Sequence, residues 1–216
     1  MKKYLIVLLF VIFSSNIIAQ SNSVGVFGGI NVSNVKNDNY FKDSKSLTKF
    51  VFGVKYQREF NKPFIVEGGI VMNNVGGRMK INVLDEVGNH IGVCYDSWVY
   101  KYISAPVMFG YKFGATFSII PKIGFQMSYL YESTINGSFN GIEHNEKMDL
   151  KSFNRFDFAG VIGAELCYSF NSNLGVFFDL SGKYSFTNAA NFDDTVLDVK
   201  FHHYSFSTVC GIKYSF

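Results

Sequence analysis

Apolar and polar side chains alternate with a period of two along most of the chain after residue 20. The clearest case is 204–216, where even positions are mainly aromatic or aliphatic and odd positions are mainly Ser, Gly and Lys. A β-strand points successive side chains to opposite faces, so this pattern predicts a strand with one apolar and one polar face. The same alternation predicts eight strands, at 24–33, 50–60, 64–73, 102–113, 116–132, 156–170, 175–186 and 204–216.

The connections between these segments alternate between short and long. Three are tight turns, at 61–63, 114–115 and 171–173, and four are longer and polar, at about 34–49, 74–98, 133–154 and 187–202. Short turns at one end and long loops at the other are typical of an outer-membrane β-barrel, whose tilted strands of about 9–11 residues cross the bilayer. An even strand count puts both chain ends on the short-turn, periplasmic side.

One long connection carries a further strand signal. Within 74–98, partly alternating flanks at 79–83 and 91–95 predict a hairpin that extends above the membrane. The predicted fold is therefore an all-β, eight-stranded, antiparallel up-and-down transmembrane barrel. The alternative count is ten strands, if 74–98 or 133–154 inserts a further hairpin.

A soluble β-sandwich would also alternate, with its apolar face inside. The strongly aromatic apolar faces, the small residues on the polar faces and the nearly balanced polar-face charges favour the barrel. A closed interior needs that balance, because a buried unpaired charge is costly. Eight strands leave an interior that side chains can fill. We therefore expect an ion-paired, closed lumen built by Lys55, Glu59, Glu67, Lys112, Lys122, Asp157, Glu165, Asp179, Lys183 and Lys213.

Residues 1–19 have the layout of a cleaved secretory signal, which leaves 20–216 as the barrel domain. Lys2 and Lys3 precede an apolar core at 4–13, and Ala19 stands before the expected cut. This core is too short to span about 30 Å of hydrocarbon as an anchor. Export implies an oxidising compartment. The three cysteines are widely spaced, so we expect isolated thiols that behave as small apolar residues.

Composition and motifs give little sign of chemistry. The 216 residues include 24 Phe and 13 Tyr, only 17% are charged, and the net charge of +3 comes without the basic patch that nucleic-acid binding requires. No phosphate loop, nucleophile elbow or zinc-binding spacing occurs, so we expect no cofactor, no metal site and no enzymatic activity. One group of candidate cation ligands lies in the predicted loops: His90, His144, Asp193, Asp194, Asp198, His202 and His203. Their spacing is not diagnostic of a cation site, so we expect solvated loops there.

An alternative is an enzyme that modifies outer-leaflet lipid. His203 and Ser205 stand two apart on one side of a predicted strand, and Glu132 or Asp157 would orient the imidazole. That side of the strand points into the lumen, whereas lipid arrives from outside the barrel. The sequence therefore favours the non-enzymatic interpretation.

Several stretches resemble the PorT-like outer-membrane β-barrel proteins of Gram-negative bacteria, and their order covers essentially all of 20–216. They are the opening strand at 25–33, the segment 102–107, the aspartate–phenylalanine–glycine strand at 156–163 and the end of the seventh strand at 184–188. The sequence departs from the family at Ser104, where the family usually has an inward glutamate, so one charge partner of the lumen is missing there. Tyr214 and Phe216 resemble the terminal aromatic signal that the outer-membrane insertion machinery pairs with by β-augmentation.

The resemblance implies an integral protein of the outer membrane, surrounded by its lipid. From the residues we expect a non-enzymatic scaffold whose outer loops, 74–98 and 133–154 above all, contact an envelope protein. Some members of the family take part in protein secretion or motility. The resemblance therefore implies, as an alternative, an accessory component of an envelope secretion complex. A small-solute channel is a further alternative.

Overall fold

The computed structural model describes residues 22–36, 44–60, 63–84, 87–139, 142–188 and 202–216. The signal peptide predicted at 1–19 lies outside these residues and stays a prediction. Within the described chain, no helix has both the length and the apolar character needed to cross a membrane. The elements are β1 (Asn22–Lys36), β2 (Lys45–Phe60), β3 (Phe64–Leu84), β4 (His90–Tyr111), β5 (Phe113–Gly114), β6 (Phe117–Phe139), β7 (Ile142–Lys147), η1 (Leu150–Ser152), β8 (Phe156–Ser169), β9 (Leu174–Ser185) and β10 (His202–Ser215).

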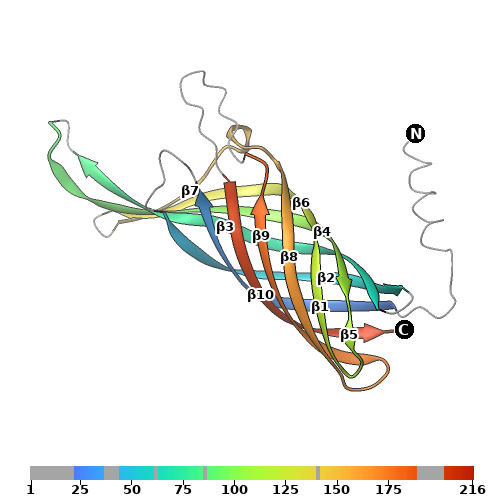
Figure 1. Ribbon diagram of the computed structural model, residues 1–216. Coiled ribbons are helices and arrows are strands. Elements are labelled where there is room, and N and C mark those ends of the chain that lie inside the picture. The colour runs from blue at the N-terminus through green and yellow to red at the C-terminus, as the bar shows by residue number, and fades with distance from the viewer. Residues whose placement is uncertain (1–21, 37–43, 61–62, 85–86, 140–141, 189–201) are drawn as a thin grey trace, which may run out of the picture.

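Eight of these strands form one closed antiparallel ring (Figure 1). The order β4–β3–β2–β1–β10–β9–β8–β6 is closed by the pairing of β4 with β6. The first and last strands pair from Ser23 opposite Ser215 to Lys36 opposite His202. A closed ring leaves no unpaired edge among its strands, which is what lipid requires of a spanning sheet. The predicted eight-stranded up-and-down barrel is confirmed, with β5 and β7 as short additions.

Several strands are longer than the alternation predicts. β3 continues to Leu84 and β4 begins at His90, so most of the predicted loop 74–98 is a paired hairpin, as its flanks indicated. β6 continues to Phe139 and pairs there with β7, so much of 133–154 is also sheet. We call the part of these strands that projects beyond the barrel, residues 79–84, 90–98, 132–139 and 142–147, the outer flap (Figure 1).

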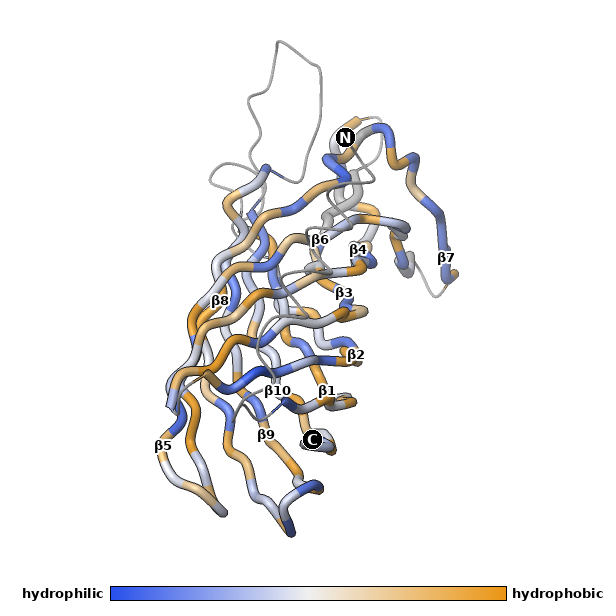
Figure 2. Tube along the Cα trace, turned by 90° about the vertical axis from the view of Figure 1, so that its right-hand side faces the viewer, coloured by the Kyte–Doolittle hydropathy of each residue, from blue (hydrophilic) through white to orange (hydrophobic). Residues whose placement is uncertain are grey.

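The apolar faces point outward and the polar faces point into the barrel. On β6, Ile123 is 64% exposed and Met127 is also exposed, whereas Ile120, Lys122 and Gln126 are buried. Hydrophobic and hydrophilic stretches alternate along the strands in Figure 2. This arrangement is the reverse of that in a water-soluble protein: the apolar outer surface meets acyl chains, and the interior holds the polar groups.

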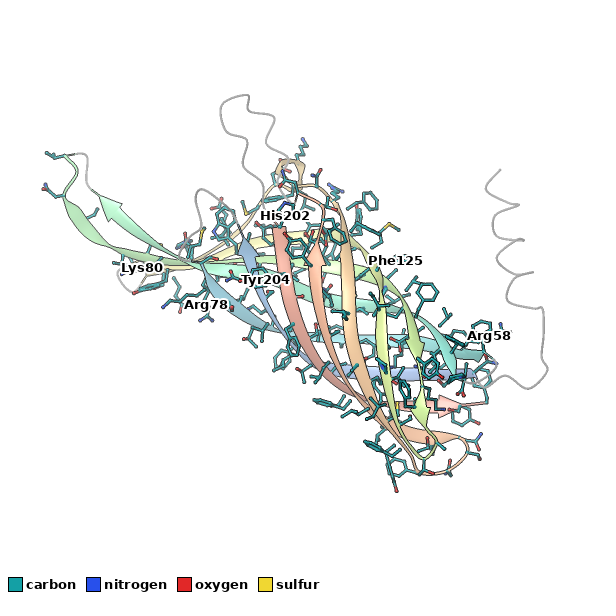
Figure 3. All side chains as sticks on the ribbon, viewed as in Figure 1. Arg58, Arg78, Lys80, Phe125, His202 and Tyr204 are labelled. Atoms are coloured by element: carbon teal, nitrogen blue, oxygen red, sulfur yellow. The ribbon has the colours of Figure 1, made fainter. Side chains whose placement is uncertain are left out.

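Aromatic pairs lie at both ends of the lipid-facing surface. Phe64 and Tyr111 pack near the short turns with ring centroids 5.3 Å apart, and Tyr129 and Phe156 pack at the opposite end at the same separation. Phe125 points away from the barrel on the surface between them (Figure 3). Aromatic girdles at both membrane interfaces are typical of outer-membrane barrels.

The interior is filled by layers that follow one another along the strands. An apolar layer lies nearest the short turns, a charged layer lies above it, and further apolar layers lie toward the flap. The apolar layers contain Ile65, Ile120, Cys167 and Phe177; then Val51, Val71 and Val209; then Val75, Tyr100, Tyr102, Leu130 and Phe153.

Candidate functional site

Five charged side chains from five strands meet inside the barrel. Lys122 Nζ on β6 lies 3.0 Å from both Glu67 Oε1 on β3 and Glu165 Oε2 on β8, and it also pairs with Asp179 on β9. Lys55 on β2 lies 3.2 Å from Glu67 and also pairs with Glu165. All five side chains are buried, Glu165 completely. Barrel closure therefore brings together charges that are far apart in the sequence.

A third lysine reaches this cluster through a cysteine. Lys213 Nζ donates to Cys167 Sγ at 3.1 Å, and the Cys167 thiol donates to Glu165 Oε1 at 2.8 Å. Three lysines thus balance three carboxylates, which offsets the cost of burying them. All three cysteines are free thiols. Cys167 is nevertheless a polar link, which corrects the expectation that every cysteine acts as a small apolar residue.

The other four predicted lumen charges make no ion pair with this cluster. Lys112 pairs with Glu59 at 2.9 Å near the short turns. Asp157 accepts a hydrogen bond from Ser185 toward the flap. Lys183 lines two interior cavities, one that also adjoins Lys122 and Asp179 and one that adjoins Ser185. It has no ion pair within 4 Å among the described residues.

Ser104 belongs to a neutral polar network in the layer between the charges and the flap. Its hydroxyl lies 2.9 Å from Asn73 Oδ1 and 2.9 Å from Ser128 Oγ. Gln126 donates to the same Ser128 oxygen at 3.0 Å. The uncharged side chain of Ser104 therefore finds hydrogen-bond partners among other uncharged groups.

The space left in the interior is small. A cavity of about 70 Å³ adjoins Phe27, Lys122 and Phe177, and another of about 20 Å³ adjoins Tyr102 and His203. A cavity needs about 10–15 Å³ of space open to the centre of a water molecule to hold one, so these cavities have room for a few waters. Phe27 and Phe177 pack edge to face at 6.4 Å and narrow the lumen. The period-two pattern missed both, because an apolar residue directly precedes each of them.

The candidate catalytic residues do not form a hydrogen-bonded triad. Both ring nitrogens of buried His203 lack a partner among the described residues, and the ring packs against Tyr100 at 5.0 Å between centroids. Glu132 instead pairs with Lys101 at 2.9 Å, and this hydrogen bond lowers the pKa of the Glu132 carboxyl. A general base must lie within hydrogen-bond reach of its partner. The predicted arrangement of His203 with Ser205 therefore does not assemble in this geometry.

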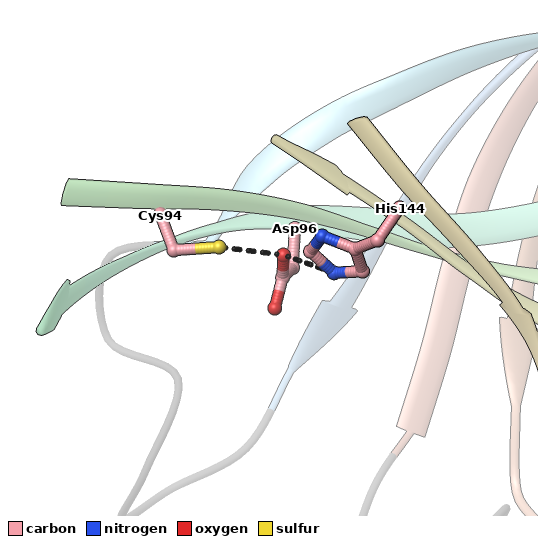
Figure 4. Close-up of side chains that lie close together, drawn as sticks. All are labelled: Cys94, Asp96 and His144. Carbon is pink, nitrogen blue, oxygen red and sulfur yellow. Dashed lines mark hydrogen bonds and ion pairs between the residues drawn. The ribbon is translucent and has the colours of Figure 1, made fainter. Parts of the chain in front are cut away.

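One histidine predicted to be solvated lies in a cluster on the outer flap. His144 Nε2 on β7 lies 3.4 Å from Asp96 Oδ1 on β4, and the Cys94 thiol donates to the same oxygen at 3.0 Å (Figure 4). The hydrogen bond to Asp96, followed by burial, raises the pKa of the Cys94 thiol. His202 stacks on Tyr184 at 6.1 Å. The remaining predicted loop groups, Asp193, Asp194, Asp198 and the His90 side chain, lie outside the described residues.

The family model described as "Outer membrane protein beta-barrel domain" matches residues 18–191. The chain belongs to this family. Membership agrees with the closed ring and the lipid-facing apolar surface, and it places the protein in the outer membrane, as predicted. A search of the curated proteins found no match.

Several solved structures of outer-membrane proteins are similar to this chain. A major outer membrane protein from Thermus thermophilus is 13% identical, with 92% of this chain and 100% of that chain covered and a TM-score of 0.50. OprG from Pseudomonas aeruginosa is 12% identical, with 91% and 95% covered and a TM-score of 0.47. Ail of Yersinia pestis, in complex with the heparin analogue sucrose octasulfate, is 18% identical, with 90% and 99% covered and a TM-score of 0.42. At 13% identity and a TM-score of 0.50, the likeness to the Thermus thermophilus protein shows the fold alone.

Proposed function

We propose that this outer-membrane barrel is a non-enzymatic, non-conducting scaffold that presents its outer flap to a protein of the cell envelope. The observation that carries the proposal is the ion-paired interior at the base of a long, hydrogen-bonded flap. The first feature blocks passage through the barrel, and the second provides a firm surface outside it.

The interior supports a closed lumen because charged and apolar layers succeed one another along its axis. Lys122 alone bridges carboxylates from three strands, so the cluster ties opposite walls of the barrel together. Val51, Val71 and Val209 form an apolar layer directly above it. Ions would have to displace paired charges and cross apolar layers, which is costly.

The flap supports a contact role because its strands stay paired well beyond the barrel. β4 pairs with β6 out to Cys94 opposite Phe139, and β6 pairs with β7 from Thr134 to Phe139. Loops held by a rigid scaffold are the usual place for binding residues. Exposed apolar side chains lie on or beside the flap tip, and aromatic residues among them are favoured at protein interfaces. These side chains are Val87, Ile91, Tyr95 and Ile142.

A second candidate is an accessory role in an envelope secretion complex. It rests on the resemblance to PorT-like proteins, and the exposed flap supports it because such a subunit needs a partner-binding surface. The two candidates differ in the identity of the bound protein, not in the surface that binds it.

We also propose that the insertion machinery recognises the last strand. Tyr214 and Phe216 are both exposed on the lipid-facing side, with ring centroids 6.3 Å apart. Their outward position is compatible with recognition before the ring closes on β1, and with a place in the aromatic girdle afterwards.

Photo-crosslinking in native membranes tests the flap. A photoreactive phenylalanine analogue replaces Tyr95, and a matched control replaces Ser172 in the exposed turn between β8 and β9. We expect a discrete protein adduct from residue 95 and none from residue 172, and mass spectrometry of the adduct separates a secretion component from another envelope protein. The same purified protein should give no steady current in a planar lipid bilayer. A steady current, or equal adducts from both positions, would contradict the proposal.

A further inference from the structure

Three potential metal ligands from two strands meet on the outer flap. Cys94 and Asp96 stand two apart on β4 and therefore share a face, and His144 comes from β7. One donor atom from each lies within 4.8 Å of the other two. Figure 4 shows the thiol and the imidazole on either side of the Asp96 carboxylate.

A glycine on the intervening strand makes this meeting possible. Gly137 on β6 pairs with Asp96 on one side and with His144 on the other. A Cβ atom at Gly137 would overlap Asp96 Oδ1 and the Cε1 and Nε2 atoms of His144. The two ligands thus lean into a space that any other residue would fill. The absence of a side chain at Gly137 leaves the room in which Asp96 and His144 meet.

We propose that Cys94, Asp96 and His144 bind one divalent cation of the zinc class, with the fourth coordination position open. A thiolate, an imidazole and a carboxylate form a donor set suited to Zn²⁺, and Mg²⁺ or Ca²⁺ prefer oxygen alone. Zinc bonds of about 2.0–2.3 Å to such donors place them roughly 3.5 Å apart in a tetrahedron. The observed Sγ–Oδ1 and Nε2–Oδ1 separations are 3.0 and 3.4 Å, and the thiol and imidazole lie within 4.8 Å of each other, so binding would draw these two groups together.

Binding would replace hydrogen bonds by coordinate bonds. The Cys94 thiol, which now donates to Asp96, would lose its proton to solvent and bind as the thiolate. His144 would bind as the neutral imidazole through Nε2. Cys94 is 8% exposed and the His144 side chain is 44% exposed, so the cation would enter from the β7 side.

The other cluster of potential ligands does not suit a cation. Glu67, Glu165 and Asp179 also lie within 4.8 Å of one another. Lys55 and Lys122 already neutralise these carboxylates and occupy the space between them. In the flap cluster the Asp96 carboxylate instead contacts a thiol and an imidazole, and both of these groups are themselves ligands.

The bound ion would connect β7 to β4 across β6. Such a link would hold β7, the edge strand of the flap among the described residues, to β4. This inference does not depend on the flap having a protein partner, because the ligands all belong to this chain.

Cobalt titration of the purified, detergent-solubilised protein tests the site. A phosphine reductant keeps the thiols reduced, and Co²⁺ serves as a visible substitute for Zn²⁺. We expect one equivalent of Co²⁺ with a thiolate-to-cobalt absorption band, displacement by Zn²⁺ and no displacement by Mg²⁺. C94S should abolish the band, and H144Q or G137A should weaken binding by about tenfold to a hundredfold.

Matched variants separate the site from general effects. C210S removes an exposed thiol elsewhere, and G28A adds a methyl group where the nearest neighbour is 3.9 Å away, so both should bind as the native protein does. Heat-dependent gel mobility verifies that each barrel is folded, and D96N replaces any variant that fails to fold. Absence of a thiolate band in the native protein at millimolar Co²⁺, or an unchanged band in C94S, would overturn the proposal.

Discussion

At the scale of single residues, Lys122 is expected to contribute more to the stability of the barrel than a charged residue on the surface does. Its ammonium group contacts three buried carboxylates, and Lys55 contacts two of the same three. Removing one partner of a buried ion cluster leaves the others unpaired in a low-dielectric setting, which is strongly destabilising. An ion pair at a wet surface has no such effect, because water replaces the lost partner.

Lys122→Met should therefore lower the free energy of unfolding by about 3–5 kcal/mol. Lys101→Met is the matched control, since Lys101 pairs with Glu132 on the flap where both side chains are partly exposed. We expect a far smaller loss for this control. Urea unfolding in lipid vesicles, followed by tyrosine and tryptophan fluorescence, measures both. A loss for Lys122→Met as small as that for Lys101→Met would show that the interior cluster does not stabilise the fold.

At the scale of strands, the alternation located each strand within the membrane but not its full length. The period-two pattern holds only where one face meets lipid and the other meets the lumen. Toward the outer end of β3 this contrast fades, and Gly76, Gly77 and Arg78 signal a loop. Pairing with β4 out to Leu84 keeps this stretch in the sheet. Backbone hydrogen bonding to a neighbour, which a sequence pattern does not display, decides the strand ends.

The seam between the first and last strands gives a sharp test of register. Gly29 on β1 lies opposite Val209 on β10, and an added Cβ would come within 2.7 Å of the Val209 Cα atom. Gly29→Ala should therefore destabilise the barrel by about 1–3 kcal/mol through overpacking. Gly28→Ala, one residue away and facing out, has its nearest neighbour at 3.9 Å and should be tolerated. Heat-dependent gel mobility reports the folded fraction of each. A destabilised G28A with a native-like G29A would refute the observed register.

At the scale of the whole molecule, the direction of each side chain could be predicted from the sequence, but the contacts that form when the ring closes could not. The alternation identified Lys55, Glu67, Lys122, Glu165 and Asp179 as inward charges. It could not say which of them meet, because that depends on the pairing partners and register of five strands and on the curvature that closes them into a ring. The link through Cys167 was missed for the same reason.

The flap cluster was beyond sequence analysis for a related reason. Cys94 and Asp96 alternate as any strand residues do, and His144 lies in a segment whose polar character predicts a solvated loop. The deciding residue is Gly137, whose role depends on the pairing of β6 with both β4 and β7. A lone glycine in a polar stretch carries no such signal by itself.

The most direct test of the account is to map which side chains meet lipid. A phospholipid with a photoreactive group in its acyl chain labels the native protein in a bilayer, and mass spectrometry locates the modified residues along β6. We predict labelling at Ile119, Ile123 and Met127, which are exposed, and none at Ile120, Lys122 and Gln126, which are buried. Labelling of the second set, or no labelling of the first, would contradict a barrel with its apolar surface in lipid and its ion pairs inside.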